Sequence, residues 1–378
     1  MKNMLSYLKV HKYDTFDVLP FNDIDSLILS QISYLNIENV IKSYSKINSL
    51  IIWDNWRILC DKTMTYRGNK KMCRMFSDNT RYKDIFVVDY EVIASDDNNT
   101  QFFAVTYYLN DFLYVAFRGT DLTIYGWRED FDMLYERTPS QIAAVNYLNF
   151  ISDKFHRPII VGGHSKGGNL ALYGAMYAKE ETKKRIIKIY NFDGPGFYDK
   201  KIYETEEFKN ASKKLFSITS RVSVVSMLLY KIPGVRFIEV RSVSVLTHDA
   251  FNWSVDVDKC KFKFVEKNSN LSRWLDAASD QYMEETTPFG RKNIVEITFK
   301  ILKESPTMSL VDVVHHPILY IKRFRVRHKA LSKDENNILE NEIKKIRKIL
   351  KISFKNSIIG KNNDIENNNK LLKGDKDE

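Results

Sequence analysis

Residues 158–178 read PIIVGGHSKGGNLALYGAMYA, and this stretch decides the fold. The apolar run at residues 159–161 predicts a short buried strand, and small and apolar residues recur at helical spacing over residues 170–178. The turn between them carries the pattern G-x-S-x-G around Ser165. A strand, a glycine turn and a helix in this order are typical of an α/β sheet.

The turn places Ser165 where a nucleophile is useful. A serine on a sharp strand-to-helix turn raises its hydroxyl at the carboxyl end of the strand, and Gly163 and Gly167 leave room for the neighbouring backbones. The backbone N–H of Lys166, at the start of the helix, would point at the oxygen of an attacked carbonyl. We therefore favour a nucleophile elbow over the alternative, an ordinary glycine-rich turn.

A second informative stretch, LYVAFRGTD at residues 113–121, predicts a buried strand that ends at Arg-Gly-Thr. In a hydrolase sheet, the loop after this earlier strand supplies the second donor of the oxyanion hole. Thr120 offers both an N–H and a hydroxyl for that role. The alternative is a plain turn in which Asp121 caps the next helix.

A serine needs a base to take its proton, and the base needs an orienting acid. His248 lies late in the chain, after the alternating apolar and polar residues 242–246, where this architecture places its base. The competitor is the histidine pair at residues 315–316, which lies in a helical pattern. The order Ser, Asp, His along the chain favours His248.

Asp193 is the candidate for the acid. It follows a predicted strand at residues 186–192, one strand earlier than the more common position for this residue. The alternatives are that Asp193 only caps the glycine-rich loop after it, or that a neutral amide or a water orients the imidazole. Asp249 adjoins His248 and is expected to face elsewhere.

The alternation of strands and helices after the elbow predicts an α/β fold, with a mostly parallel central sheet flanked by helices. We expect a helical N-terminal segment over residues 1–80 and a core over residues 81–300, in which residues 254–291 are candidates for a cap. A basic helical extension over residues 301–359 and a disordered tail over residues 360–378 complete the predicted organisation.

Composition restricts the function classes. The net charge is +10, and residues 322–378 hold 16 Lys and Arg against 9 Asp and Glu, so this segment carries 7 of the 10 surplus charges. The basic run at residues 322–329 could contact an anionic surface, although a solvated helix face is the simpler interpretation, and no specific nucleic acid is expected. Three unpatterned cysteines and no leader or spanning segment predict a cytoplasmic protein without metal or other cofactor.

Several motifs together resemble a bacterial family of lipase-like α/β hydrolases, the Mbeg-like family, which is related to the class 3 lipases. The resemblance covers roughly residues 20–300 and rests on seven segments in the same order: DSLILSQISYL at 25–35, RYKD at 81–84, AFRGTD at 116–121, GWREDF at 126–131, GHSKGGNLA at 163–171, DGPGF at 193–197 and HDAFNW at 248–253. It implies an α/β-hydrolase fold and ester hydrolysis.

By the same resemblance, Ser165 is the nucleophile, His248 the base, and Thr120 with the Lys166 N–H the oxyanion hole. The class 3 lipases take their acid from a segment similar to residues 221–227, where this chain has Ser223. The resemblance therefore assigns no acid.

The sequence predicts a serine hydrolase that cleaves carboxylic esters, with a small-molecule or lipid ester as substrate. The candidate catalytic residues are Ser165, His248 and Asp193, and the oxyanion donors are Thr120 and Lys166. The alternative is a catalytically inactive binding module on a hydrolase fold, since a fold does not fix a function.

Overall fold

The computed structural model describes most of the chain. The described residues are 2–374 apart from 42–43, 52, 64, 77, 96–99, 121–123, 221–222, 224–228, 242–246, 267–269 and 304–330. The predicted alternation at residues 242–246, the basic run at 322–329 and the histidine pair at 315–316 lie outside them.

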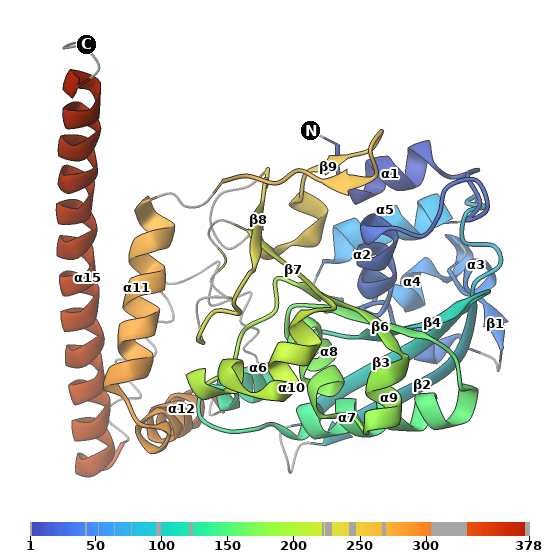
Figure 1. Cartoon of the computed structure of the whole chain (residues 1–378). Helices are drawn as coiled ribbons and strands as arrows, with labels where there is room; N and C mark the ends of the chain where they lie inside the picture. The colour runs from blue at the N-terminus through green and yellow to red at the C-terminus, as the bar shows by residue number, and fades with distance from the viewer. Residues whose placement is uncertain are drawn as a thin grey trace.

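One eight-stranded sheet runs through the molecule, with its strands in the order of the sequence (Figure 1). The first four strands pair antiparallel, and β4 to β8 pair parallel. The strands are β1 (Ser45–Lys46), β2 (Phe86–Ser95), β3 (Thr100–Leu109), β4 (Phe112–Phe117), β5 (Ile159–His164), β6 (Ile186–Phe192), β7 (Leu215–Ser220) and β8 (Arg236–Ile238). This arrangement confirms the predicted α/β-hydrolase fold with its mostly parallel sheet.

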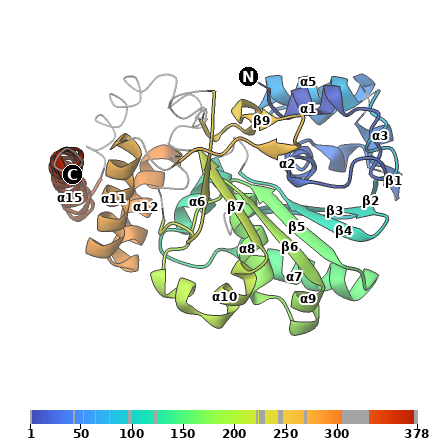
Figure 2. The same cartoon turned by 45° about the horizontal axis from the view of Figure 1, so that its top comes forward.

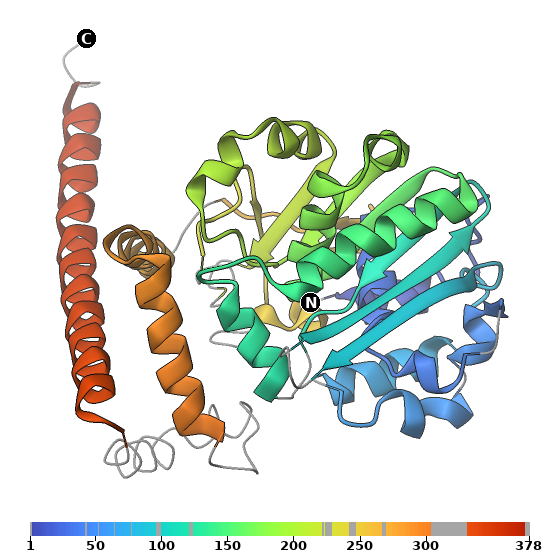
Figure 3. The same ribbon diagram turned by 90° about the horizontal axis from the view of Figure 1, so that it is seen from below.

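Helices cover both faces of the sheet (Figures 1 and 3). The N-terminal helices lie on one face: α1 (Met4–Val10), α2 (Asp23–Ile32), α3 (Ile47–Leu50), α4 (Trp56–Leu59) and α5 (Tyr66–Phe76). On the other face lie α7 (Pro139–Phe155), α8 (Lys166–Tyr177), α9 (Glu180–Arg185) and α10 (Glu206–Ser212). Short 3₁₀ turns connect the elements: η1 (Ile37–Asn39), η2 (Trp53–Asn55), η3 (Lys200–Glu204) and η6 (Ala250–Asn252).

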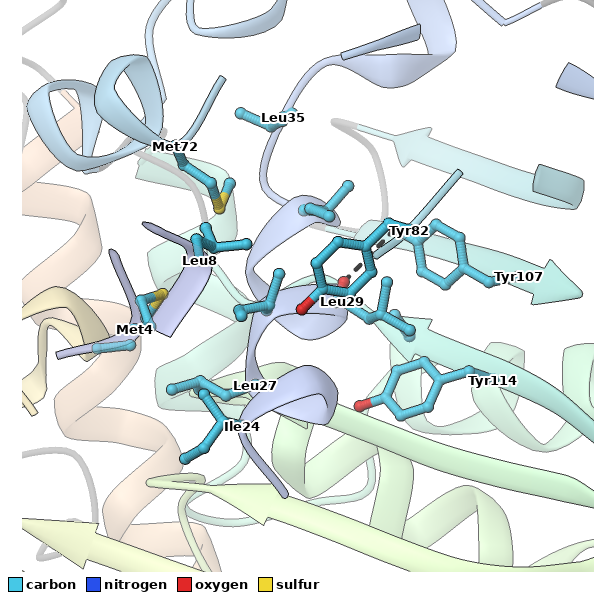
Figure 4. Packing of buried hydrophobic residues seen from close by; sticks show 14 of the residues in the cluster. Met4, Leu8, Ile24, Leu27, Leu29, Leu35, Met72, Tyr82, Tyr107 and Tyr114 are labelled. Atoms are coloured by element: carbon cyan, nitrogen blue, oxygen red, sulfur yellow. Dashed lines mark hydrogen bonds between the residues drawn. The ribbon is translucent and has the colours of Figure 1, made fainter. Parts of the chain in front are cut away.

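Alternate residues of the central strands enter two separate cores. In β3, Val105 belongs to the cluster beneath the N-terminal helices, and its neighbour Ala104 belongs to the cluster beneath α7 and α8. Successive side chains of a strand point to opposite faces, so a sheet covered on both sides needs apolar residues in continuous runs. Figure 4 shows the first core, where α2 packs between α1 and the tyrosines Tyr107 and Tyr114 of the sheet.

A buried ion pair joins α2 to the segment before β2. The guanidinium of Arg81 donates to both carboxylate oxygens of Asp25, at 2.8 and 2.6 Å, and both side chains are almost completely buried. Tyr82 Oη donates to the same carboxylate at 2.7 Å. Arg81 also donates to three backbone carbonyls, those of Asp14, Leu19 and Pro20. A buried charge is tolerated only with such a complete set of partners.

The segment expected to form a cap divides into two parts. Its first part joins the core beneath the N-terminal helices, because β9 (Val255–Asp256) pairs with β10 (Lys261–Phe262) and the backbone N–H of Val255 donates to Lys2 O at 2.9 Å. Its second part, α11 (Asn270–Glu285), lies beside the long helix α15 (Lys333–Gly374), and Figure 2 shows both at one side of the molecule.

Helix α12 (Pro288–Lys303) follows α11 and packs against α15 and against α6 (Ile124–Asp132) of the core. Of the extension predicted at residues 301–359, the structure describes residues 301–303 at the end of α12 and the part from residue 331 onward, most of which lies in α15. The Trp274 indole N–H donates to Leu350 O at 3.0 Å and ties α11 to α15. Helix α15 continues to Gly374, where we expected a disordered tail from residue 360. The segment holds no proline, the residue that most strongly interrupts a helix. Among the described helices, none is long and apolar enough to cross a bilayer.

Replacing Arg81 by methionine should destabilise the fold strongly. The Arg81→Met variant leaves Asp25 buried without its cation, and we expect the free energy of unfolding to fall by about 3–5 kcal/mol. Urea denaturation measures this. The matched control is Lys179→Met, which breaks the exposed pair between Lys179 and Asp153 and should cost at most about 1 kcal/mol. Equal losses in the two variants would contradict the importance of the buried pair.

Candidate active site

Three predicted site residues follow the ends of three adjacent strands. Thr120 comes three residues after β4, Ser165 directly follows β5, and Asp193 directly follows β6. The strands are parallel neighbours, so their carboxyl ends lie at one edge of the sheet. Hydrolytic sites of open α/β sheets lie at this edge.

Ser165 has the backbone geometry of a nucleophile elbow. Its φ is +58° and its ψ is −135°, a conformation that non-glycine residues seldom adopt. Such strained backbone occurs mainly at functional sites, where the surrounding structure enforces it. Its N–H donates to Phe192 O at 2.9 Å, and its own carbonyl accepts from the Gly168 N–H at 2.8 Å. The turn is therefore held on both sides of the serine.

The two glycines of the motif are required by close backbone contacts. A Cβ on Gly163 would lie 2.3 Å from the carbonyl of Gly167, and a Cβ on Gly167 would lie 2.1 Å from Phe117 O of β4. Any larger residue would push α8 away from the sheet. The close approach of neighbouring backbones is the reason for which the motif predicts glycine at both positions.

The structure brings His248 and Asp193 together. His248 Nδ1 lies 2.7 Å from Asp193 Oδ2. A carboxylate can only accept, so Nδ1 carries the proton and Nε2 is left as the basic nitrogen of the neutral ring. The hydroxyl of Thr219, on β7, donates to the other carboxylate oxygen of Asp193. The Asp193 side chain is completely buried, and that of His248 is mostly buried.

Asp193 also has an unusual backbone. Its φ is +56°, and its N–H donates to Ile218 O at 2.7 Å. Left-handed backbone at a buried aspartate turns its carboxylate toward the loop that carries His248. Asp193 therefore does more than cap the loop that follows it.

His164 lies between the nucleophile and the base: it precedes Ser165 in the chain and contacts His248 through its ring. The ring of His164, the residue before the nucleophile, stacks on the His248 ring with centroids 4.6 Å apart. No hydrogen bond joins Ser165 Oγ to His248 within the described part of the chain. Catalytic hydrogen bonds are often long in unliganded enzymes and shorten when substrate binds.

Thr120 is buried, and its hydroxyl donates to Asp130 Oδ2 at 2.5 Å. Asp130 lies on α6, and its Oδ1 is shielded from solvent without a hydrogen-bond partner among the described residues. Burial raises the pKa of Asp130 to about 6, although the nearby Lys166 ammonium and the Thr120 hydroxyl oppose the shift. Burial beside the candidate oxyanion hole thus favours the protonated form of this carboxyl group more than water does.

The side chain of Lys166 has a role that the sequence analysis missed. Its ammonium donates to Glu129 Oε2 at 2.9 Å and to Gln101 O at 2.8 Å, and the lysine and glutamate side chains are both almost completely buried. Glu129 further accepts from the N–H and the hydroxyl of Ser140. The segment GWREDF, which holds Glu129 and Asp130, was recognised as a motif, but nothing in the sequence indicates which side chains it meets.

One surface cavity among the described residues lies away from Ser165 and His248. It has a volume of about 450 Å³ and lies between α7, α8 and the loop after β6, where Arg137, Tyr173 and Asp199 contribute to its lining. Ser165 and His248 do not line it. No three or more His, Cys, Asp or Glu side chains gather as a metal site in the described ranges.

Replacing Asp130 by asparagine should change how stability depends on pH. Because burial raises the folded-state pKa of Asp130 from 3.8 to about 6, the stabilisation from its protonated form is present at low pH and is lost as the pH rises through about 6. Asp130→Asn removes this titration. Relative to the variant, the wild type should lose about 2 kcal/mol of unfolding free energy between about pH 4.5 and pH 7.5.

Guanidinium denaturation at the two pH values measures the difference between the wild type and the Asp130→Asn variant. Asparagine keeps an oxygen that can accept from Thr120, and any change in the strength of this hydrogen bond shifts the variant by a constant amount, which cancels in the comparison. Parallel pH profiles for the two proteins would show that Asp130 does not titrate in this range.

Two solved structures resemble the chain. The M37 lipase is 16% identical with a TM-score of 0.35, and the alignment covers 56% of this chain and 70% of the lipase. The Rhizomucor miehei lipase in its propeptide complex is 17% identical with a TM-score of 0.34, and the alignment covers 56% of this chain and 66% of that one. Likeness at this level carries no argument about chemistry. None of the curated proteins matches the chain.

A family model gives a firmer assignment. The model described as Mbeg1-like matches residues 76–300, which is more than half of the chain and includes all the strands from β2 to β8. The match also contains Thr120, Ser165, Asp193 and His248. The chain therefore belongs to the Mbeg1-like family, in agreement with the resemblance seen in its motifs.

Proposed function

We propose that this protein is a serine hydrolase that cleaves carboxylic esters. Ser165 is the nucleophile, His248 the general base and Asp193 the acid that orients it. The observation that carries the proposal is the 2.7 Å hydrogen bond between His248 Nδ1 and Asp193 Oδ2. This hydrogen bond involves Asp193, which follows β6 at the same edge of the sheet as Ser165 with its positive φ.

This hydrogen bond has a direct chemical consequence. With Nδ1 protonated and bound to Asp193, the free lone pair of the imidazole is on Nε2, the nitrogen that can take a proton from a serine hydroxyl. The buried carboxylate also stabilises the imidazolium that forms during the reaction. A merely structural histidine would need neither the orientation nor the buried carboxylate.

In the first half of the reaction, Ser165 Oγ attacks the ester carbonyl while His248 Nε2 takes the hydroxyl proton. The carbonyl oxygen becomes an oxyanion, and the backbone N–H groups of Thr120 and Lys166 are the proposed donors to it. His248 then gives its proton to the leaving alcohol, which departs as the ester C–O bond breaks. Ser165 remains as an acyl ester.

In the second half, water attacks the acyl ester as His248 Nε2 takes one of its protons. The tetrahedral intermediate collapses, Ser165 Oγ receives the proton back from His248, and the carboxylic acid leaves. Every proton transfer uses the same nitrogen, so the position of His248 governs both halves.

The proposed substrate is a small-molecule or lipid ester. The contact of the basic C-terminal segment with an anionic surface and a cytoplasmic location remain predictions from the sequence. The acyl chain and the leaving alcohol are for substrate screening to identify.

A fluorophosphonate probe tests the proposed triad, because it reacts only with an activated serine. We expect the wild type to be labelled and Ser165→Ala not to be labelled. His248→Ala and Asp193→Asn should react more slowly by about three to four orders of magnitude, since either change removes the oriented base. The rate of probe incorporation, followed by gel fluorescence, gives these values.

The matched control for Asp193→Asn is Asp199→Asn, the same change in an exposed aspartate six residues further along the same loop. It should react like the wild type. A folded wild type that takes up no probe, with unfolding curves that show the native state, would overturn the hydrolase proposal and favour an inactive binding module.

The Thr120→Val variant tests the oxyanion hole. Valine preserves the shape and the backbone N–H of threonine but removes the hydroxyl that ties this loop to Asp130. We expect the labelling rate to fall by about 10- to 100-fold, because the donor N–H is displaced. The control is Thr106→Val, which removes a buried hydroxyl hydrogen bonded to Tyr147 at 2.8 Å in β3. A similar decrease in both variants would mean that the effect comes from lost stability.

A further inference from the structure

His164, the last residue of β5, contacts the loop that carries the proposed base. Its imidazole stacks on that of His248, with ring centroids 4.6 Å apart and an angle of 30° between the ring planes. Its Nε2 lies 2.8 Å from His248 O. The residue that precedes the nucleophile therefore touches both the ring and the backbone of the base.

The hydrogen bonds of His164 fix its tautomer. A carbonyl oxygen can only accept, so the Nε2 nitrogen that faces His248 O must carry the proton. Nδ1 is then the acceptor, and the hydroxyl of Tyr34 lies 3.1 Å from it. The same hydroxyl lies 3.1 Å from the carbonyl of His164, so its single proton is shared between these two acceptors. The Nε2–H bond to His248 O is therefore the main hydrogen bond of the ring.

The surroundings also keep His164 uncharged. Burial and the adjacent His248 both hold the pKa of His164 well below its usual value. The groups that face it are Tyr34, His248 and the edge of Trp253, whose ring centroid is 5.4 Å away, and none of them is an anion at neutral pH. A neutral ring adds no charge beside His248 when that residue becomes an imidazolium.

Two successive carbonyls of the base loop accept from buried rings. The indole N–H of Trp253 donates to Thr247 O at 2.9 Å, and His164 Nε2–H donates to the next carbonyl, that of His248. Trp253 is completely buried. The backbone at His248 is therefore attached to the sheet by one donor and to the following turn by the other.

We propose that His164 is a positioning residue for the proposed hydrolysis: its Nε2–H holds the backbone of His248, and its ring supports the ring of His248, so that the base stays aligned with Ser165. The catalytic role of His164 rests on the proposed function. The two contacts of His164 with His248, the hydrogen bond and the ring stacking, do not depend on it. One residue couples the strand of the nucleophile to the loop of the base.

Two variants separate the two contacts. His164→Phe preserves a flat ring for stacking but has no N–H, whereas His164→Gln has an amide that can reach His248 O but no ring. We expect His164→Phe to slow fluorophosphonate labelling by about 10- to 100-fold, because small displacements of a catalytic group have effects of this size. His164→Gln should recover at least half of that loss on a logarithmic scale.

The control is Tyr114→Phe, which removes buried hydrogen bonds to Ser26 and Ser30 without contacting His248. It should label at the wild-type rate even if its unfolding free energy falls as much as that of His164→Phe. A loss of labelling in Tyr114→Phe equal to that in His164→Phe would assign the effect to stability and overturn the proposal.

An activity-independent measurement distinguishes failure of this inference from failure of the proposed function. In ¹⁵N-histidine spectra of the wild type, His164, assigned by its absence from the variants, should stay neutral with the proton on Nε2 from about pH 5 to pH 8. The His248 resonances should shift in His164→Phe. These results would support the proposed contacts between His164 and His248 even if no protein took up the probe. A His164 that titrates near its ordinary pKa, or carries its proton on Nδ1, would overturn it.

Discussion

The close approach of three backbone segments at the end of β5 is the constraint on which the rest of the site depends. A Cβ on Gly163 would collide with the carbonyl of Gly167, and a Cβ on Gly167 would collide with Phe117 O. No side chain fits between them, so α8 begins directly against the strands, and Ser165 is forced into left-handed backbone. The same approach brings the end of β4, and with it Thr120, beside the first turn of α8.

Buried hydrogen bonds connect this region to α6. Lys166, whose N–H is a proposed oxyanion donor, extends its side chain to the buried Glu129, and the next residue, Asp130, accepts from Thr120. These groups connect α8, α6 and the loop after β4. Removing one partner would leave a charge without compensation in a region of low dielectric constant, so the network favours one arrangement of the loop.

On the other side of Ser165, the base is positioned by groups that are distant in the sequence. Asp193 and Thr219 orient one side of the His248 ring, and His164 supports its face and its backbone. The proposed chemistry requires one nitrogen of His248 to exchange protons in both halves of the reaction. This proton exchange requires that the imidazole be held in one position and orientation.

The sequence alone indicated the longer strands of the sheet and the strand, turn and helix around Ser165, because local periodicity and glycine spacing report backbone geometry directly. It favoured His248 as the base, and that role stays a prediction. The pairing of Asp193 with His248 was one alternative among several, and the contacts of His164, Lys166 and Asp130 were not predicted. Those depend on which loops meet when β4, β5 and β6 align, and residues up to 130 positions apart become neighbours only then. Hydrogen-bond partners across such separations are decided by tertiary packing, since no local pattern encodes them.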